Sequence, residues 1–140
     1  MSEATSLFGE EHVRRYRETD GEVGHIWKEG STILLLTTKG RKTGEPRTTP
    51  LIYAEDGDRY VIVASKGGAP DDPGWYENLS KDPTVELQVK DDVFPARAQV
   101  AEGEERDRLW RKANEVWPHY DEYQEKTDRE IPVVVLERAA

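Results

Sequence analysis

Residues 33–65 read ILLLTTKGRKTGEPRTTPLIYAEDGDRYVIVAS, and this stretch decides the fold. The apolar and β-branched run Ile33–Thr38 predicts a buried strand. Two further runs, Thr48–Ala54 and Arg59–Ser65, predict a second and a third strand, and the Asp-Gly-Asp sequence between them is a hairpin signal. The three strands are joined by short turns, the first of them over Lys39–Pro46.

The sequence beyond residue 65 predicts three more strands and several helices. Alternating apolar and polar residues predict strands over Val85–Val89 and Phe94–Val100, and Val133–Leu136 predicts a final strand. Helices are expected over 7–20, over 74–81 and, in two pieces separated near Pro118, over 102–126. Six short strands with most helices late in the chain favour an antiparallel α+β barrel.

Composition limits the classes of function. The chain has 140 residues and a formal charge of −9, which fits one domain over residues 1–140 with a helical arm over 1–20 and argues against a nucleic-acid-binding face. Without cysteine the chain has no disulfide and no thiolate site, and its three histidines lack a metal-ligand spacing. No apolar run approaches the roughly 20 residues of a membrane span. We therefore expect a cytoplasmic protein with no metal and no nucleic-acid partner.

Four cations and two glycines lie together in Lys39–Arg47, although the rest of the chain is strongly acidic. The glycines let the backbone turn sharply and present N–H groups, which suits a phosphate. Arg41 and Arg47 can each bind an anion through two hydrogen bonds, and Lys42 can add a point charge. A solvated hairpin tip is the alternative, but the composition of the turn favours a phosphate or carboxylate site.

A second glycine pair follows the third predicted strand, in the segment Ser65-Lys66-Gly67-Gly68. Glycines at the end of a strand let a flat or anionic ligand approach the backbone closely, whereas the alternative is a flexible loop. Trp75 and Asn78 follow on the short predicted helix, where an aromatic side chain often serves packing. Together with the basic turn, the Ser65–Gly68 segment predicts two walls of one pocket.

Three aromatic residues, Trp117, Tyr120 and Tyr123, are spaced three apart and would share one face of a helix. They could form a core stripe, but their polar neighbours indicate that the stripe is partly exposed. Tyrosine hydroxyls over a cleft can hydrogen-bond a substrate and donate a proton. Because the sequence offers no thiol, metal or paired-acid site, redox chemistry would need a bound cofactor.

Four segments, in this order, carry a resemblance to a known family: LLTTKGRKTGEPRTTPL (35–51), VASKGGAP (63–70), PGWYENL (73–79) and YQEKTDREIPV (123–133). From about Tyr16 to Leu136 the chain resembles the deazaflavin (F420)-dependent nitroreductase and quinone reductase family. The resemblance implies a split β-barrel of about six mostly antiparallel strands with peripheral helices. It also implies that the barrel binds coenzyme F420, an 8-hydroxy-5-deazaflavin with a phosphate and a polyglutamate tail.

The resemblance further implies roles for individual residues. The phosphate and the start of the tail would be held by Arg41, Lys42 and Arg47. The deazaflavin ring would be lined by the backbone of Thr49, Pro50 and Leu51. The ring and its side chain would be flanked by Ser65, Lys66, Gly67 and Gly68, with Trp75 and Asn78 behind them. The substrate would be covered by Trp117, Tyr120 and Tyr123, and the proton would come from the hydroxyl of Ser65, Tyr120 or Tyr123, or from water.

The activity implied by the resemblance is hydride transfer from reduced F420 to a quinone, a nitroaromatic compound or an activated alkene such as an enone. Two alternatives stay open: a non-catalytic split barrel that binds F420 or a lipid-like ligand, and an FMN-dependent oxidoreductase of the same fold. A monomer and a homodimer are both compatible with the sequence. Peripheral contact of the N-terminal arm with a membrane is also left open.

Overall fold

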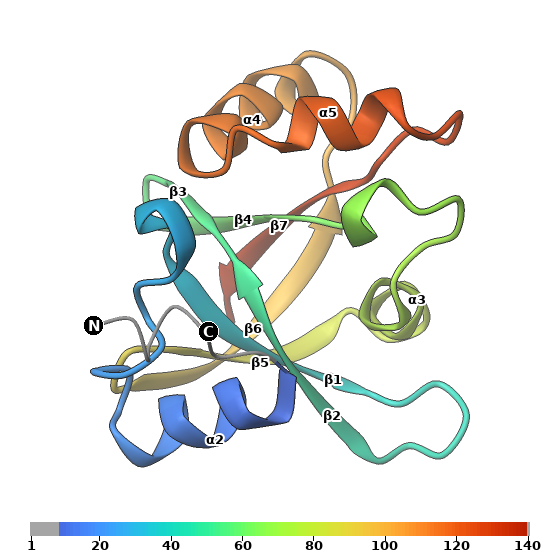
Figure 1. Ribbon diagram of the computed structural model, residues 1–140. Helices are drawn as coiled ribbons and strands as arrows, with labels where there is room; N and C mark the ends of the chain where they lie inside the picture. Colours follow the sequence, from blue (N-terminus) through green and yellow to red (C-terminus); the bar gives the residue numbers. More distant parts are fainter. Residues whose placement is uncertain (1–8, 140) are drawn as a thin grey trace.

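A computed structural model describes residues 9–139, and one curled antiparallel sheet contains the seven strands of this part of the chain (Figure 1). The strands are β1 Ile33–Lys39, β2 Pro46–Ile52, β3 Ala54–Asp56, β4 Arg59–Val63, β5 Thr84–Val89, β6 Asp92–Val100 and β7 Val133–Arg138. Their order across the sheet is β2-β1-β5-β6-β7-β4-β3, and every neighbouring pair is antiparallel.

The two edge strands of this sheet, β2 and β3, are joined through one residue, Tyr53. Tyr53 donates its backbone N–H to the carbonyl oxygen of Thr32 at 3.0 Å and accepts the Thr32 hydroxyl at 3.0 Å. The prediction of one continuous strand over 48–54 is therefore wrong, because β2 pairs with β1 whereas β3 pairs with β4. Since the chain itself links the two edges, the sheet curls into the expected split β-barrel of the α+β class.

The helices are α2 Gly9–Glu18, α3 Gly74–Lys81, α4 Gly103–Val116 and α5 Tyr120–Glu125, with two short 3₁₀ turns, η1 Lys28–Gly30 and η2 Lys66–Gly68. The predicted short helix and the break near Pro118 are both confirmed. Of the expected N-terminal arm, residues 1–8 lie outside the described residues. Within residues 9–139, no helix combines the length and apolar character that a membrane crossing requires, and no cluster of metal-ligating side chains occurs.

The barrel interior is filled by apolar side chains, among which Leu36, Leu87 and Leu136 are fully buried. Burying a leucine side chain contributes about 1.5–3 kcal/mol, so these strands are held mainly by their inward faces. A separate apolar cluster packs α4 and α5 against the end of β4 through Val63 and Ile131. This second cluster fixes the aromatic face of α5 beside the point where β4 ends.

Candidate functional site

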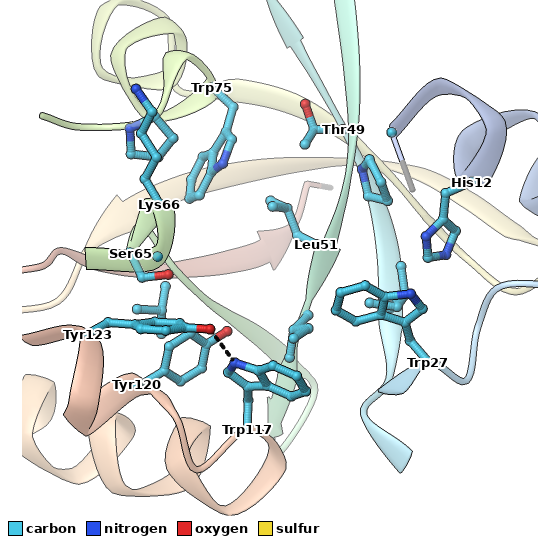
Figure 2. A pocket seen from close by; sticks show the side chains of 17 residues that line it. His12, Trp27, Thr49, Leu51, Ser65, Lys66, Trp75, Trp117, Tyr120 and Tyr123 are labelled. Carbon is cyan, nitrogen blue, oxygen red and sulfur yellow. Dashed lines mark hydrogen bonds between the residues drawn. The ribbon is translucent and has the colours of Figure 1, made fainter. Parts of the chain in front are cut away.

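A cavity of about 610 Å³ lies between β2, η2, α3 and α5, which is the size of a typical ligand pocket (Figure 2). Ten of the fifteen residues singled out in the sequence line it: Thr49, Pro50, Leu51, Ser65, Lys66, Gly67, Trp75, Trp117, Tyr120 and Tyr123. Segments that are far apart in the chain therefore meet at one cavity, but of the two walls predicted from the sequence only the Ser65–Gly68 segment contributes to its lining, and the cations of the basic turn do not. The other five residues lie outside its lining: Arg41, Lys42, Arg47, Gly68 and Asn78.

The η2 wall presents backbone N–H groups. Ser65 is right-handed (φ −78°, ψ −38°), whereas Lys66 and Gly67 are left-handed, with φ values of 48° and 65°. A right-handed residue followed by a left-handed one turns successive N–H groups to the same side, where they can bind an anionic or carbonyl oxygen. Within residues 9–139, neither the Lys66 nor the Gly67 N–H has a hydrogen-bond acceptor.

Gly68 joins the η2 wall to α5. A Cβ atom at Gly68 would lie 2.8 Å from the carbonyl oxygen of Tyr123, and its φ of 87° also requires glycine. The second glycine of the pair therefore serves close packing of two walls of the cavity. The first, Gly67, lines the cavity and has open space where a Cβ would be.

Arg129 fastens the η2 segment from behind, and the sequence reasoning missed this role. Its guanidinium group donates to the carbonyl oxygens of Ala64 at 3.3 Å, Ser65 at 2.9 Å and Ala69 at 2.9 Å. It also pairs with the carboxylate of Asp72 at 2.9 Å. The arginine lies within the resemblance segment 123–133, which was the one available signal for it.

Hydroxyl groups gather at the end of the cavity formed by η2 and α5. Tyr123 accepts a hydrogen bond from the indole N–H of Trp117 at 3.2 Å, which leaves its own O–H free to donate (Figure 2). Tyr120 is almost fully buried, and this burial raises the pKa of its hydroxyl. Within the described residues, neither the Tyr120 hydroxyl nor the Ser65 hydroxyl has a hydrogen-bond partner.

The opposite end of the cavity is lined by His12 and Trp27, which the sequence reasoning did not single out (Figure 2). The indoles of Trp27 and Trp117 stack with their centroids 5.9 Å apart, and the His12 ring lies 6.2 Å from that of Trp27. His12 and Tyr16 are both buried and stand four residues apart on α2. That helical spacing was the signal available for His12.

The basic turn between β1 and β2 is fixed to α3 through Arg41. The side-chain oxygen of Asn78 accepts the backbone N–H of Arg41 at 3.2 Å and its guanidinium at 2.9 Å. Glu77 pairs with the same guanidinium at 2.7 Å. The resemblance implies that Asn78 lies behind the coenzyme, and the structure shows in addition that its side chain holds the basic turn.

The two other cations of the predicted anion site, Lys42 and Arg47, are exposed. No acidic side chain within residues 9–139 forms an ion pair with either of them. In a chain of charge −9, two cations without such partners next to an anchored arginine leave a local positive surface.

Comparisons with known proteins agree on one family. The family model described as F420H(2)-dependent quinone reductase matches residues 8–138. The chain is 48% identical to an F420H(2)-dependent quinone reductase of Mycobacterium tuberculosis, over 91% of this chain and 87% of that protein. Among solved structures it is similar to an F420-H2 dependent reductase, FDR-A, with a TM-score of 0.71 and 49% identity over 75% of this chain and 93% of the other. A domain-swapped dimer is similar with a TM-score of 0.72 and 44% identity, over 89% and 96% of the two chains.

Proposed function

The chain belongs to the F420H(2)-dependent quinone reductase family, and from this premise we propose that it is an oxidoreductase that passes a hydride from reduced F420 to a quinone. The observation that carries the proposal is the shared cavity, in which unpaired N–H groups of η2, an apolar wall from β2 and free hydroxyls of α5 face one space. Nitroaromatic compounds and activated alkenes are further acceptors of the same chemical kind.

The residues fit the coenzyme. Pro50, Leu51 and Trp75 offer apolar surface for a flat ring. The free N–H groups of Lys66 and Gly67 suit the ring's carbonyl oxygens. We assign the phosphate and the start of the tail to the exposed cations Lys42 and Arg47, with Arg41 held beside them by α3.

Reduced F420, when bound, supplies the hydride. The chain holds the acceptor against the ring and excludes water from the cavity, a proximity effect worth up to roughly 7–11 kcal/mol in favourable cases. Reduction of a quinone to a hydroquinone also requires a proton. The Tyr123 O–H is oriented to donate because its oxygen accepts from Trp117. Tyr120 and Ser65 add hydroxyls that can stabilise the developing oxyanion.

A fluorescence titration of the protein with F420, run beside FMN, tests the cofactor. Binding of F420 at micromolar or lower concentration, with no binding of FMN, is the expected result. Oxidation of the bound reduced coenzyme by a quinone such as menadione, followed anaerobically by absorbance, then tests the reaction. F420 binding without oxidation by any quinone would indicate a carrier protein, and preferential FMN binding would overturn the assignment.

Three further expectations belong to this proposal. We place the protein in the cytoplasm, with no nucleic-acid partner and with residues 1–140 as one domain. A similar solved protein is a domain-swapped dimer, which favours testing for a homodimer alongside the monomer. Light scattering during size-exclusion chromatography distinguishes these two states.

A further inference from the structure

The side chain of His12 is buried, and only one of its two ring nitrogens has a hydrogen-bond partner among the described residues. It is 2% exposed, and its Nε2 lies 2.8 Å from the carbonyl oxygen of Gly24. A carbonyl oxygen only accepts hydrogen bonds, so Nε2 carries the hydrogen in this contact. In the neutral ring Nδ1 is then a bare acceptor, and it has no partner within residues 9–139.

The position of the His12 ring is set by the surrounding backbone. A Cβ atom on Gly24 would lie 3.0 Å from Cδ2 and 3.1 Å from Nε2 of His12, so this edge of the ring packs directly on the Gly24 loop. One helical turn away, the Tyr16 hydroxyl donates to the Ile33 carbonyl at 3.0 Å and accepts the Lys90 N–H at 2.7 Å. These contacts fasten α2 to the barrel and leave the Nδ1 edge as the part of His12 that faces away from Gly24.

His12 lines the cavity at the end opposite Ser65 and Tyr123 (Figure 2). Between the two ends lie the indoles of Trp27 and Trp117, whose centroids are 5.9 Å apart and whose planes are inclined by 28°, and both line the cavity as an aromatic wall. Aromatic ligands pack favourably on such a wall, and a polar group at its end can fix their orientation. Nδ1 is not among the fully enclosed side-chain atoms of the described residues that lack a partner, so a ligand in the cavity that His12 lines can reach it and donate to it.

We propose that Nδ1 of His12 accepts a hydrogen bond from a hydroxyl group of an aromatic ligand lying against the Trp27–Trp117 wall. The hydrogen bond to Nδ1 would favour binding of ring-hydroxylated quinones over their unsubstituted or O-methylated counterparts. The hydroxyl groups of a hydroquinone product could donate to Nδ1 in the same way. The inference rests on the proposed function only in identifying the ligand as the electron acceptor. The hydrogen bond itself requires no coenzyme.

Calorimetric titration of the full chain without F420 tests the contact directly, with 2-naphthol and 2-methoxynaphthalene as probes. The two ligands differ in the ability of their oxygen to donate. We expect 2-naphthol to bind about five- to tenfold more tightly, the size of one hydrogen bond. Equal affinities would overturn the proposal. Because F420 is absent, failure here is distinguishable from failure to bind the coenzyme.

Two variants test whether Nδ1 of His12 is the atom that accepts the hydrogen bond. His12→Gln places a donor near the Nε2 position, for Gly24, and removes the Nδ1 acceptor, so the preference for 2-naphthol should disappear. His12→Asn retains a polar group at the Nδ1 position but cannot reach Gly24, and should keep part of the preference. A preference that survives in His12→Gln would assign the contact to another group.

An NMR measurement on the unmodified protein tests the same hydrogen bond even if a variant fails to fold. The ¹⁵N resonance of His12 Nδ1 should move in the direction of a hydrogen-bonded imidazole nitrogen when 2-naphthol is added, and should stay in place with 2-methoxynaphthalene. An unchanged resonance under saturating 2-naphthol would overturn the proposal.

Discussion

The guanidinium group of Arg129 donates a hydrogen bond to the carbonyl oxygen of Ser65 at 2.9 Å, although 64 residues separate them in the sequence. The Ser65 carbonyl and the Lys66 N–H belong to one planar peptide unit and point in opposite directions. Because Arg129 holds the Ser65 carbonyl, the Lys66 N–H is directed away from Arg129, and it has no acceptor within residues 9–139. A residue outside the cavity lining therefore orients a donor that we assign to the coenzyme.

Replacement of this arginine tests the relationship. Arg129→Lys keeps the charge opposite Asp72 but cannot reach three carbonyl oxygens at once. We expect F420 affinity to fall about tenfold and the free energy of unfolding to fall by about 1–3 kcal/mol. Fluorescence titration and urea denaturation measure the two effects. Arg97→Lys on β6, an exposed position, is the control, and lower stability with unchanged affinity would reduce Arg129 to a purely structural role.

Asn78 offers a second test of positioning. It is 5% exposed, accepts two hydrogen bonds from Arg41 and donates to the Thr38 hydroxyl at 3.0 Å. Asn78→Ala should lower the free energy of unfolding by about 2–3 kcal/mol and weaken F420 binding, because the basic turn loses its anchor. Glu77→Ala removes only an exposed ion pair with Arg41 and should cost less than about 1 kcal/mol. Equal effects of the two variants would contradict this account.

Much of the fold follows from local patterns in the sequence. The buried run that became β1 and the alternation in β5 and β6 were predicted because apolar periodicity reports which face of a strand is buried. The break at Tyr53 was not predicted, since residues 48–54 have strand composition throughout. Only the pairing partners, β1 on one side of Tyr53 and β4 on the other, reveal the break.

The candidate site was predictable where motifs carry glycines, cations or aromatic spacing, and less so elsewhere. Lys66 and Tyr123 came from such motifs and do line the cavity. The four-residue spacing of His12 and Tyr16 predicts that His12 faces the barrel, but it does not predict a cavity there. Trp27 was missed because it reaches the cavity through the packing of the segment before β1, which no local pattern encodes. The bonds from Asn78 to Arg41 were not predicted, because the resemblance gives the position of a residue but not its hydrogen-bond partners.

The anion site can be tested by charge removal. Lys42→Ala and Arg47→Ala should each weaken F420 binding about five- to tenfold, since each removes a charge-assisted contact to the phosphate or tail. The contacts are exposed, so raising the salt concentration from about 0.05 to 0.5 M should weaken binding to the unmodified protein more than to the double variant. Arg97→Ala changes the net charge equally and is the control. Unchanged F420 affinity in Lys42→Ala would show that this turn does not bind the phosphate or the tail.

The proton donor can be identified by removing single hydroxyls. Tyr123→Phe should lower kcat/KM for a quinone about 10- to 100-fold with little change in F420 affinity, because the oriented O–H is lost. Tyr120→Phe should have a smaller effect, since burial raises the pKa of that hydroxyl and makes proton release costly. Steady-state kinetics with each variant measure the difference. A larger loss of kcat/KM in Tyr120→Phe than in Tyr123→Phe would identify Tyr120 as the proton donor.

The free energy of unfolding at acidic pH should depend on Asp56, whose carboxylate joins the β3–β4 hairpin to α4. Hydrogen bonds from Arg108, at 2.8 and 3.1 Å, and from Arg59 hold the pKa of Asp56 well below its ordinary value of 3.8. A carboxyl whose pKa is lower in the folded than in the unfolded state stabilises the fold above the ordinary pKa. This contribution is lost as the pH falls through the lowered pKa.

Asp56→Asn should therefore reduce the free energy of unfolding by about 1 kcal/mol at pH 7, a modest value because the arginines are partly exposed to solvent. The difference between the variant and the unmodified protein should stay constant down to about pH 5 and shrink below pH 3.8. Urea denaturation at pH 7, 5, 4 and 3 measures it, with Asp92→Asn, an exposed carboxylate paired with Arg138, as the control. A difference in the free energy of unfolding that grows as the pH falls would contradict the lowered pKa of Asp56.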